Sequence, residues 1–305
     1  MNEFDLIKRY FRDRAMRKDV VLGPGDDSAL LVPPADQELV MTMDTLITGV
    51  HFPPDMPPRA MGFRALATNL SDLAAMGAEP AWCLLSLSVP ESDQAWLDAF
   101  CSGFFALADH ANVSLVGGDM VRGPLSITIQ ATGFVPTGAA LTRAGAQVGD
   151  RIVIGGVPGE AAAGFEQWES GIKSGRLIDR FCYPEPQIEL GLALRGKATA
   201  AIDVSDGLLA DLGHILQESG DLGADIHLEQ LPPVRFEDGT PDQANMHQWQ
   251  LAGGDDYLLL FTLPEGEPLP DECIDIGCVT DSGTILLVDA EGTRQAPTAF
   301  GWTHF

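Results

Sequence analysis

Aspartate-rich turns recur beside apolar segments of this chain, and they constrain its fold more than any other feature. The first is Gly-Pro-Gly-Asp-Asp, in which Asp26 and Asp27 follow a tight turn at residues 23–25 and precede an apolar run. Two adjacent carboxylates repel each other unless a positive charge lies between them or water screens them. Further aspartates follow the same pattern at Asp44, Asp72, Asp119, Asp203, Asp206, Asp255 and Asp256. The pattern predicts that the turns converge on one site that binds several metal ions and handles phosphate.

The segments between these turns alternate between strand and helix patterns. In the first half, strands are predicted at residues 28–32, 39–43, 82–89, 114–116 and 125–135, and helices at 3–14, 59–76 and 92–111. In the second half, strands are predicted at residues 151–154, 199–204 and 256–263, with helices from 160 and after 207. The helix after 207 has an apolar stripe at helical spacing, formed by Leu208, Leu209, Leu212, Ile215 and Leu216. Ser205 is the candidate N-cap of the latter helix.

Strands often follow one another directly, which favours two α/β or α+β domains over one doubly wound sheet. The small, polar stretch at residues 136–140 is the candidate boundary. We therefore expect an N-terminal domain at residues 1–136 and a C-terminal α/β domain at residues 137–305.

The charge of the chain excludes one class of partner. The net charge is −26 and only four residues are lysine, so duplex nucleic acid is not expected to bind, because phosphate contacts need a basic face. No apolar run is long enough to span a membrane, and the N-terminus has no apolar signal segment, so a cytoplasmic location is expected. Five scattered cysteines are expected to be free thiols, most of them buried.

Common nucleotide and metal signatures are absent. Residues 191–198 nearly match a phosphate-binding loop, but Ala198 replaces the required hydroxyl residue and the segment resembles a helix end. An EF-hand starting at Asp203 would need a glutamate where His214 stands. Oxygen ligands remain, and they are the ligands that magnesium prefers, together with substrate phosphates.

Two local patterns refine this prediction. Asn69 and Asp72 are three residues apart on the predicted helix at 59–76, so they share one face, where a carboxylate among apolar residues needs a partner. His51 precedes a proline-rich loop that is expected to hold it in place.

Several of these segments together resemble the thiamine-monophosphate kinase family, in order along most of the chain. They are Leu22–Leu31, Thr45 after Asp44, His51-Phe52, Asn69–Ala78, Gly117-Gly118-Asp119, Leu141-Thr142-Arg143, Asp203–Leu208 and Gly253–Tyr257. The resemblance implies transfer of the γ-phosphoryl group of ATP to thiamine monophosphate, which gives thiamine diphosphate. It also implies a two-domain fold similar to aminoimidazole ribonucleotide synthetase, in which two N-terminal domains pair in a homodimer and ATP lies along the cleft between domains.

The resemblance also implies roles for individual residues. The magnesium ligands would be Asp27, Thr42, Met43, Asp44, Asp72, Asp119, Asp203 and Asp206. Gly118, Asp119, Arg143 and Ser205 would contact ATP, and His51, Asp255 and Trp302 would contact thiamine monophosphate. Two positions depart from the family, which usually has Glu at Asp255 and Thr at Met43; the second change is harmless if only the Met43 carbonyl is used.

The implied reaction needs no side-chain nucleophile, because the attacking group is an already ionised phosphate oxygen of the substrate. Two rival hypotheses remain open. One is another ATP-dependent enzyme of the same fold, similar to aminoimidazole ribonucleotide synthetase, although that would not explain His51 or Trp302. The other is a non-enzymatic acidic protein that binds calcium.

Overall fold

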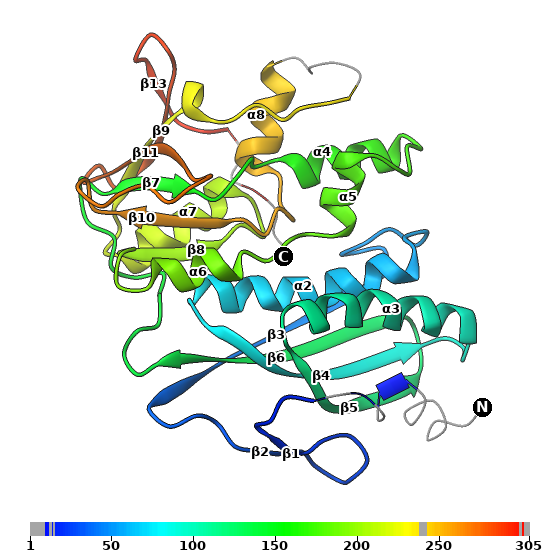
Figure 1. Cartoon of the computed structure of the whole chain (residues 1–305). Helices are drawn as coiled ribbons and strands as arrows, with labels where there is room; N and C mark the ends of the chain where they lie inside the picture. Colours follow the sequence, from blue (N-terminus) through cyan, green and yellow to red (C-terminus); the bar gives the residue numbers. More distant parts are fainter. Residues whose placement is uncertain (1–9, 12–13, 15, 238–242, 299–300, 302–305) are drawn as a thin grey trace. The chain divides into compact units, whose positions relative to one another are not determined.

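The computed structural model describes residues 10–11, 14, 16–237, 243–298 and 301 (Figure 1). The chain divides into two compact units: residues 1–73 with 78–138, and residues 74–77 with 139–305. The helix predicted at residues 3–14 lies largely outside the described residues.

The first unit is built on a four-stranded sheet with the order β3-β6-β4-β5. The strands are β3 (Gln37–Ile47), β4 (Glu79–Val89), β5 (Ser114–Arg122) and β6 (Ser126–Pro136). Helices α2 (Pro58–Ala75) and α3 (Gln94–His110) lie over one face of this sheet (Figure 1). A short ribbon of β1 (Val20–Leu22) and β2 (Leu30–Leu31) packs near one end of the sheet through Leu31 and Trp82.

Both helices have the boundaries that the sequence predicts, to within two residues. Asp93 caps α3 by accepting hydrogen bonds from the amides of Ala95 and Trp96. Gly77 follows α2 with φ 63°, a left-handed conformation that favours glycine at a helix end. Gly62 and Gly103 let the helices touch, because a side chain at either position would clash with the backbone of the other helix.

Two strands extend further than the sequence predicts. β3 was expected to end at Asp44, but it pairs with β6 without interruption from Gln37 to Ile47. β5 was expected to end before the Gly-Gly-Asp turn, but it continues beside β4 as far as Arg122. Neither extension could be predicted from the local sequence, because each depends on hydrogen bonds with a partner strand that is distant along the chain. Asp44 and Asp119 therefore lie within strands and not in turns.

The second unit is built on a seven-stranded sheet with the order β13-β12-β9-β11-β7-β10-β8. All neighbouring strands are antiparallel except β9 and β12. The strands are β7 (Arg151–Ile154), β8 (Ala200–Asp203), β9 (Gly223–His227), β10 (Leu259–Leu263), β11 (Ile274–Thr280), β12 (Ile285–Val288) and β13 (Arg294–Gln295).

Helices contribute to the apolar cores of this sheet. They are α4 (Glu160–Glu169), α5 (Arg176–Cys182), α6 (Ile188–Leu194), α7 (Leu208–Glu218), the 3-10 helix η2 (Leu228–Gln230) and α8 (Gln243–Ala252). Successive side chains of β7 point to opposite faces of the sheet and enter two different apolar cores. Ile152 and Ile154 pack in the core that contains α7, and Val153 packs in the core that contains Leu194 of α6. The predicted apolar stripe of α7 is buried, and residues 188–194 form a helix, which confirms that the near-match at 191–198 is not a phosphate-binding loop.

The cysteine prediction is confirmed. All five cysteines are free, and four of them are buried: Cys83, Cys101, Cys182 and Cys273. Within the described part of the chain, no helix is both long enough and apolar enough to cross a membrane.

Candidate functional site

A pair of carboxylates lies between β3 and α2 in the first unit. The hydroxyl of Thr42 donates to Asp72 Oδ2 at 2.5 Å. Next to it along β3, the amide of Asp44 donates to Asn69 Oδ1 at 3.2 Å. Asn69 is fully buried, and its own amide group donates to the carbonyl of Ala65. The prediction that Asn69 and Asp72 share one helix face is confirmed, and that face meets the strand that carries Asp44.

The carboxyl of Asp44 is partly withdrawn from water. Burial raises its pKa, while a hydrogen bond with Thr68 and the charge of His51 lower it. The ring of His51 is held by its Nδ1, which accepts the amide of Ile47 at 3.0 Å. This bond leaves the ring proton on Nε2 when the imidazole is neutral. The loop therefore holds His51 in place, as predicted, in the neighbourhood of Asp44.

Asp119 lies on the other face of the same sheet. It alternates with buried Met120 and pairs in register with Ser86, which pairs with Thr128 of β6. Thr128 is bonded to Thr45 through their hydroxyl oxygens, 2.8 Å apart. Asp44 and Thr45 point to opposite faces, so the first unit does not gather Asp119 with Asp44 and Asp72.

Three further predicted residues of the first unit are exposed. Asp27 is exposed after the glycine turn, and its amide donates to Asp26 Oδ1 at 2.8 Å, so Asp26 caps the turn. Met43 exposes 65% of its surface on the face opposite Asp44. Gly118 has φ 150°, and a side chain there would clash with the backbone of Leu85.

In the second unit, Asp203 is the last residue of β8, and the turn that follows carries Ser205 and Asp206. Asp203 is buried, and Ser205 and Asp206 are partly exposed. Ser205 is not the N-cap of α7, which contradicts the sequence prediction; Gly207 occupies that position and has φ 121°. The chain turns sharply at this glycine, and the amides of residues 205–207, which precede the first helical residue, face an acceptor inside the helix.

That acceptor is Asp211, which sequence reasoning missed. Its Oδ2 accepts the amides of Ser205, Asp206 and Gly207 at 3.0, 3.1 and 3.1 Å. Asp211 is 2% exposed, and burial, reinforced by the charge of Asp206, raises the pKa of its carboxyl to about 7 against the effect of these three bonds. The only local signal was an acidic residue in the first turn of a helix, where it complements the helix dipole.

The turn before β10 packs against this one. The amide of Asp255 donates to the Ser205 carbonyl at 2.9 Å, and the amide of Tyr257 donates to the Val204 carbonyl at 2.8 Å. Asp255 and Tyr257 have φ 70° and 53°, a left-handed conformation that aspartate tolerates but that is strained for the bulky tyrosine, and such residues cluster at functional sites. The Tyr257 hydroxyl donates to Asp255 Oδ1 at 3.2 Å. The left-handed residues also explain why β10 begins at Leu259 and not at 256.

Asp256 holds the turn from its other side. Its carboxylate accepts the amides of Gly159, at 2.5 Å, and Ala161, at 3.0 Å, and so caps the N-terminus of α4. Burial raises the pKa of Asp256 to about 7, and the carboxylates of Asp255 and Glu160 act in the same direction. Glu160 is itself neutralised by Arg176 and Arg180 of α5.

The remaining predicted residues lie apart from these turns. The Arg143 carbonyl accepts the hydroxyl of Ser219, beyond the C-terminal end of α7, whereas Ser205 and Asp206 precede its N-terminal end. Trp302 lies outside the described residues. The preceding residue, Gly301, lies so close to Asp206 that a side chain on it would clash with the Asp206 carbonyl.

The side-chain oxygens at these positions are ligands that suit magnesium, but neither unit by itself brings all the predicted ligands together in one site. Asp44, Asp72 and Thr42 offer hard oxygen ligands, and Asp44 is a partly desolvated carboxylate that a cation would stabilise. Across the described residues, no three His, Cys, Asp or Glu side chains lie close enough together to hold a metal ion. Water and substrate phosphate would have to complete the coordination.

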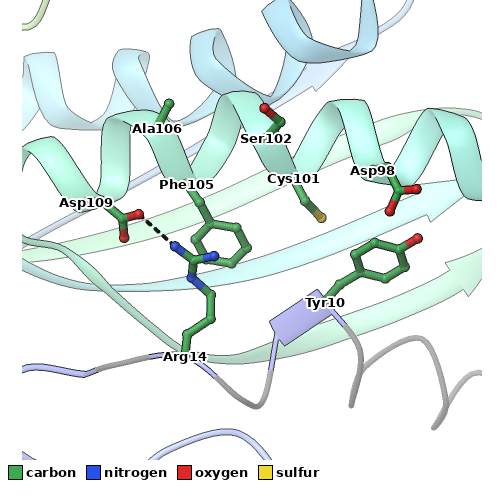
Figure 2. A pocket seen from close by; sticks show the side chains of 8 residues that line it. All are labelled: Tyr10, Arg14, Asp98, Cys101, Ser102, Phe105, Ala106 and Asp109. Carbon is green, nitrogen blue, oxygen red and sulfur yellow. Dashed lines mark hydrogen bonds and ion pairs between the residues drawn. The ribbon is translucent and has the colours of Figure 1, made fainter.

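A separate pocket of about 490 Å³ lies on the outer side of α3 and contains none of the predicted site residues. Figure 2 shows the Arg14 side chain reaching across it to Asp109, with the ring of Phe105 behind the guanidinium. The ion pair is 2.7 Å long, and the guanidinium carbon lies 3.7 Å from the ring centre. The Arg14 guanidinium therefore fills part of the pocket.

Comparisons with known proteins extend this picture. Residues 25–135 match the family model of the AIR synthase related protein, N-terminal domain. The thiamine-monophosphate kinase of Escherichia coli K12 is 49% identical over 275 residues, which cover 86% of this chain and 83% of the relative. The crystal structure of thiamine-monophosphate kinase from Stenotrophomonas maltophilia is 42% identical, with a TM-score of 0.86 over 97% of this chain and 98% of that one. AaThiL complexed with AMPPCP and TMP is 29% identical, with a TM-score of 0.78 over 99% and 96% of the two chains.

Proposed function

Because the chain belongs to the thiamine-monophosphate kinase family, we propose that it transfers the γ-phosphoryl group of ATP directly to the phosphate of thiamine monophosphate. The products are ADP and thiamine diphosphate. The related AaThiL in complex with AMPPCP, an ATP analogue, and TMP supports both substrates. The five free cysteines fit a reducing compartment such as the cytoplasm.

The acids of both units serve this reaction. In the first unit, Asp44 and Asp72 hold magnesium, assisted by Thr42, the Met43 carbonyl and Asp27. Asp119 lies on the other face of the sheet, apart from this pair, and binds another of the magnesium ions. In the second unit, Asp203 and Asp206 do the same. A net charge of −26 is coherent with this role, because the carboxylates hold cations and the cations meet the phosphates.

The other predicted residues contact the substrates. Gly118, Asp119, Arg143 and Ser205 contact ATP. His51 contacts the phosphate end of thiamine monophosphate, for which its Nε2 proton is a suitable donor because Nδ1 is occupied by Ile47. Asp255 offsets the charge of the cationic thiazolium, and Trp302 stacks on a ring of the substrate.

The residues of the chain contribute orientation and charge and not a nucleophile. Magnesium, when bound, supplies the positive charge that offsets two polyanions and stabilises charge as it shifts during transfer. The partly buried carboxylates fix the position of that charge. The Thr42 hydroxyl holds the Asp72 carboxylate, and the Asn69 side chain holds the backbone at Asp44.

One observation carries the proposal: the neighbouring pairs Thr42–Asp72 and Asp44–Asn69 present two carboxylates from a strand and a helix that the family resemblance singles out. The test mixes the protein with ATP, magnesium and thiamine monophosphate and follows phosphorus NMR. A new diphosphate signal of thiamine diphosphate is expected with ADP. Its absence, in protein whose circular dichroism shows it to be folded, would contradict the proposal.

We also propose that the open face of the first unit's sheet pairs with a second copy of the chain. This face carries exposed apolar side chains on three strands: Leu39, Met41, Met43, Leu84 and Val121. Exposed apolar side chains on several strands of one sheet face favour a self-complementary interface. Light scattering should give twice the chain mass, and Met41→Glu should give a monomer; a monomeric wild type would contradict this part of the proposal.

A further inference from the structure

The turn between β8 and α7 is held by an unusual arrangement of hydrogen bonds. Three consecutive amides, those of Ser205, Asp206 and Gly207, point at one oxygen of Asp211. Consecutive backbone amides in a turn can form a concave site that attracts anions such as phosphate. Here the chain's own carboxylate fills that site.

The same turn carries two side chains of the proposed magnesium and ATP site. Asp211 is 2% exposed, whereas Ser205 and Asp206 are partly exposed, so the bonds act from the interior on residues that face outward. The turn is fixed from a second direction by the amides of Asp255 and Tyr257, which donate to its carbonyls. With amides bound on one side and carbonyls on the other, few backbone conformations remain for Ser205 and Asp206.

We propose that Asp211 is a positioning residue: it fixes the backbone of Ser205 and Asp206 so that their side chains meet magnesium-bound ATP, and it keeps phosphate off the amides of this turn. This inference rests on the proposed function for the identity of the ligand. Asp211 itself is not expected to touch ATP or the metal ion.

The experiment compares Asp211→Ala with Asp211→Asn. Asparagine keeps an acceptor oxygen for the amides, and alanine removes it. The affinity for ATP is measured by calorimetry at several magnesium concentrations, and kcat and KM are measured separately. The alanine variant should bind ATP at least tenfold more weakly in magnesium, with KM for thiamine monophosphate within twofold of wild type. The asparagine variant should bind ATP with an affinity within about threefold of wild type.

Asp225→Ala is the matched control. Asp225 is also a buried aspartate of the second unit, and it accepts two bonds from Arg294. β9, which carries it, lies four strands away from β8 in the sheet, a distance of about 19 Å. The Asp225→Ala variant should have a lower melting temperature than wild type and the same affinity for ATP. An equal loss of affinity in Asp225→Ala, or ATP binding within twofold of wild type in Asp211→Ala, would overturn the proposal.

A measurement on the unmodified protein covers the case in which the variants do not fold. Hydrogen exchange should show the three amides of the turn protected without nucleotide, because Asp211 already occupies them. Protection that arises only when ATP is added would mean that the amides are a ligand site and would refute the positioning role. If wild type binds ATP but forms no thiamine diphosphate, the proposed function fails while the affinity comparison still tests Asp211.

Discussion

In the first unit, Asp44 and Asp72 lie on a strand and a helix that run without interruption through them, whereas in the second unit Asp206 and Asp255 lie in turns. In the first pair, the Asp72 carboxylate accepts the Thr42 hydroxyl, and the backbone amide of Asp44 donates to the neutral side chain of Asn69. The second pair is held through its backbone, by carboxylates or carbonyls that accept main-chain amides. Regular structure fixes a side chain's position at little extra cost, but a turn needs further bonds to be equally rigid.

The difference divides the acids of the second unit into two groups. Asp203, Asp206 and Asp255 belong to the proposed site, and Asp211 and Asp256 organise the backbone beneath it. Substitutions in the first unit should therefore reduce activity more than stability. In the second unit, the organising acids should affect stability as well.

The largest effect is expected for Asp72→Asn. If Asp72 is a metal ligand, kcat/KM should fall at least a thousandfold, about 4 kcal/mol of transition-state stabilisation. The melting temperature should change little, because asparagine keeps an acceptor for the Thr42 hydroxyl. Asp109→Asn, which breaks only the exposed ion pair with Arg14, is the control and should retain activity. Near-normal turnover in Asp72→Asn would show that Asp72 is no ligand.

The next effect is on stability, in Asp256→Ala. Two amides at the N-terminus of α4 lose a partly buried acceptor, which should lower the free energy of unfolding by about 3 kcal/mol. Asp93→Ala is the matched variant in the first unit, where an exposed aspartate caps α3, and about 1 kcal/mol is expected. Urea denaturation of both variants measures the contrast. Equal losses of unfolding free energy in the two variants would mean that the partial burial of Asp256 adds nothing to its hydrogen bonds with the α4 amides.

The pH dependence of Asp256 sharpens this contrast. Its pKa is raised to about 7 in the folded chain, against about 3.9 when unfolded. The native carboxyl therefore keeps a proton that the unfolded chain releases, and this contribution to stability is complete below pH 4 and lost as the pH rises through 7. Relative to Asp256→Asn, which does not titrate, wild type should lose on the order of 3 kcal/mol from pH 4 to 7. A constant difference across this range would contradict the raised pKa.

Local patterns in the sequence predict α2, α3, α4 and α7, but they miss α5, α8 and the strands β9, β11, β12 and β13, and they place strand ends poorly. The spacing of Asn69 and Asp72, and the apolar stripe of α7, needs only helix periodicity, and both are confirmed. The extension of β3 past Asp44 depends on β6, about eighty residues later, which no local pattern contains.

In the candidate site too, contacts between residues far apart in the sequence could not be predicted. Asp256 meets amides 95 and 97 residues away, so its role could not be predicted from its neighbours. Ser205 looked like an N-cap because serine is favoured there, but the buried carboxylate of Asp211 supplies the acceptor from inside the helix.

The smallest effect tests whether the neutral partners in the first unit matter at all. Thr42→Val keeps the side chain's shape and removes the hydroxyl that donates to Asp72. One hydrogen bond to a carboxylate should contribute about 1 kcal/mol to the geometry of the pair, so about fivefold more magnesium should be needed for half-maximal activity, with kcat almost unchanged at saturation. A fall in kcat as large as that of Asp72→Asn would show that Thr42 contributes to the bound magnesium as much as a carboxylate does, and not mainly by holding Asp72. No change in the magnesium requirement would mean that the strand and helix alone position Asp72. The first unit would then need no side-chain support, while the second unit depends on Asp211 and Asp256.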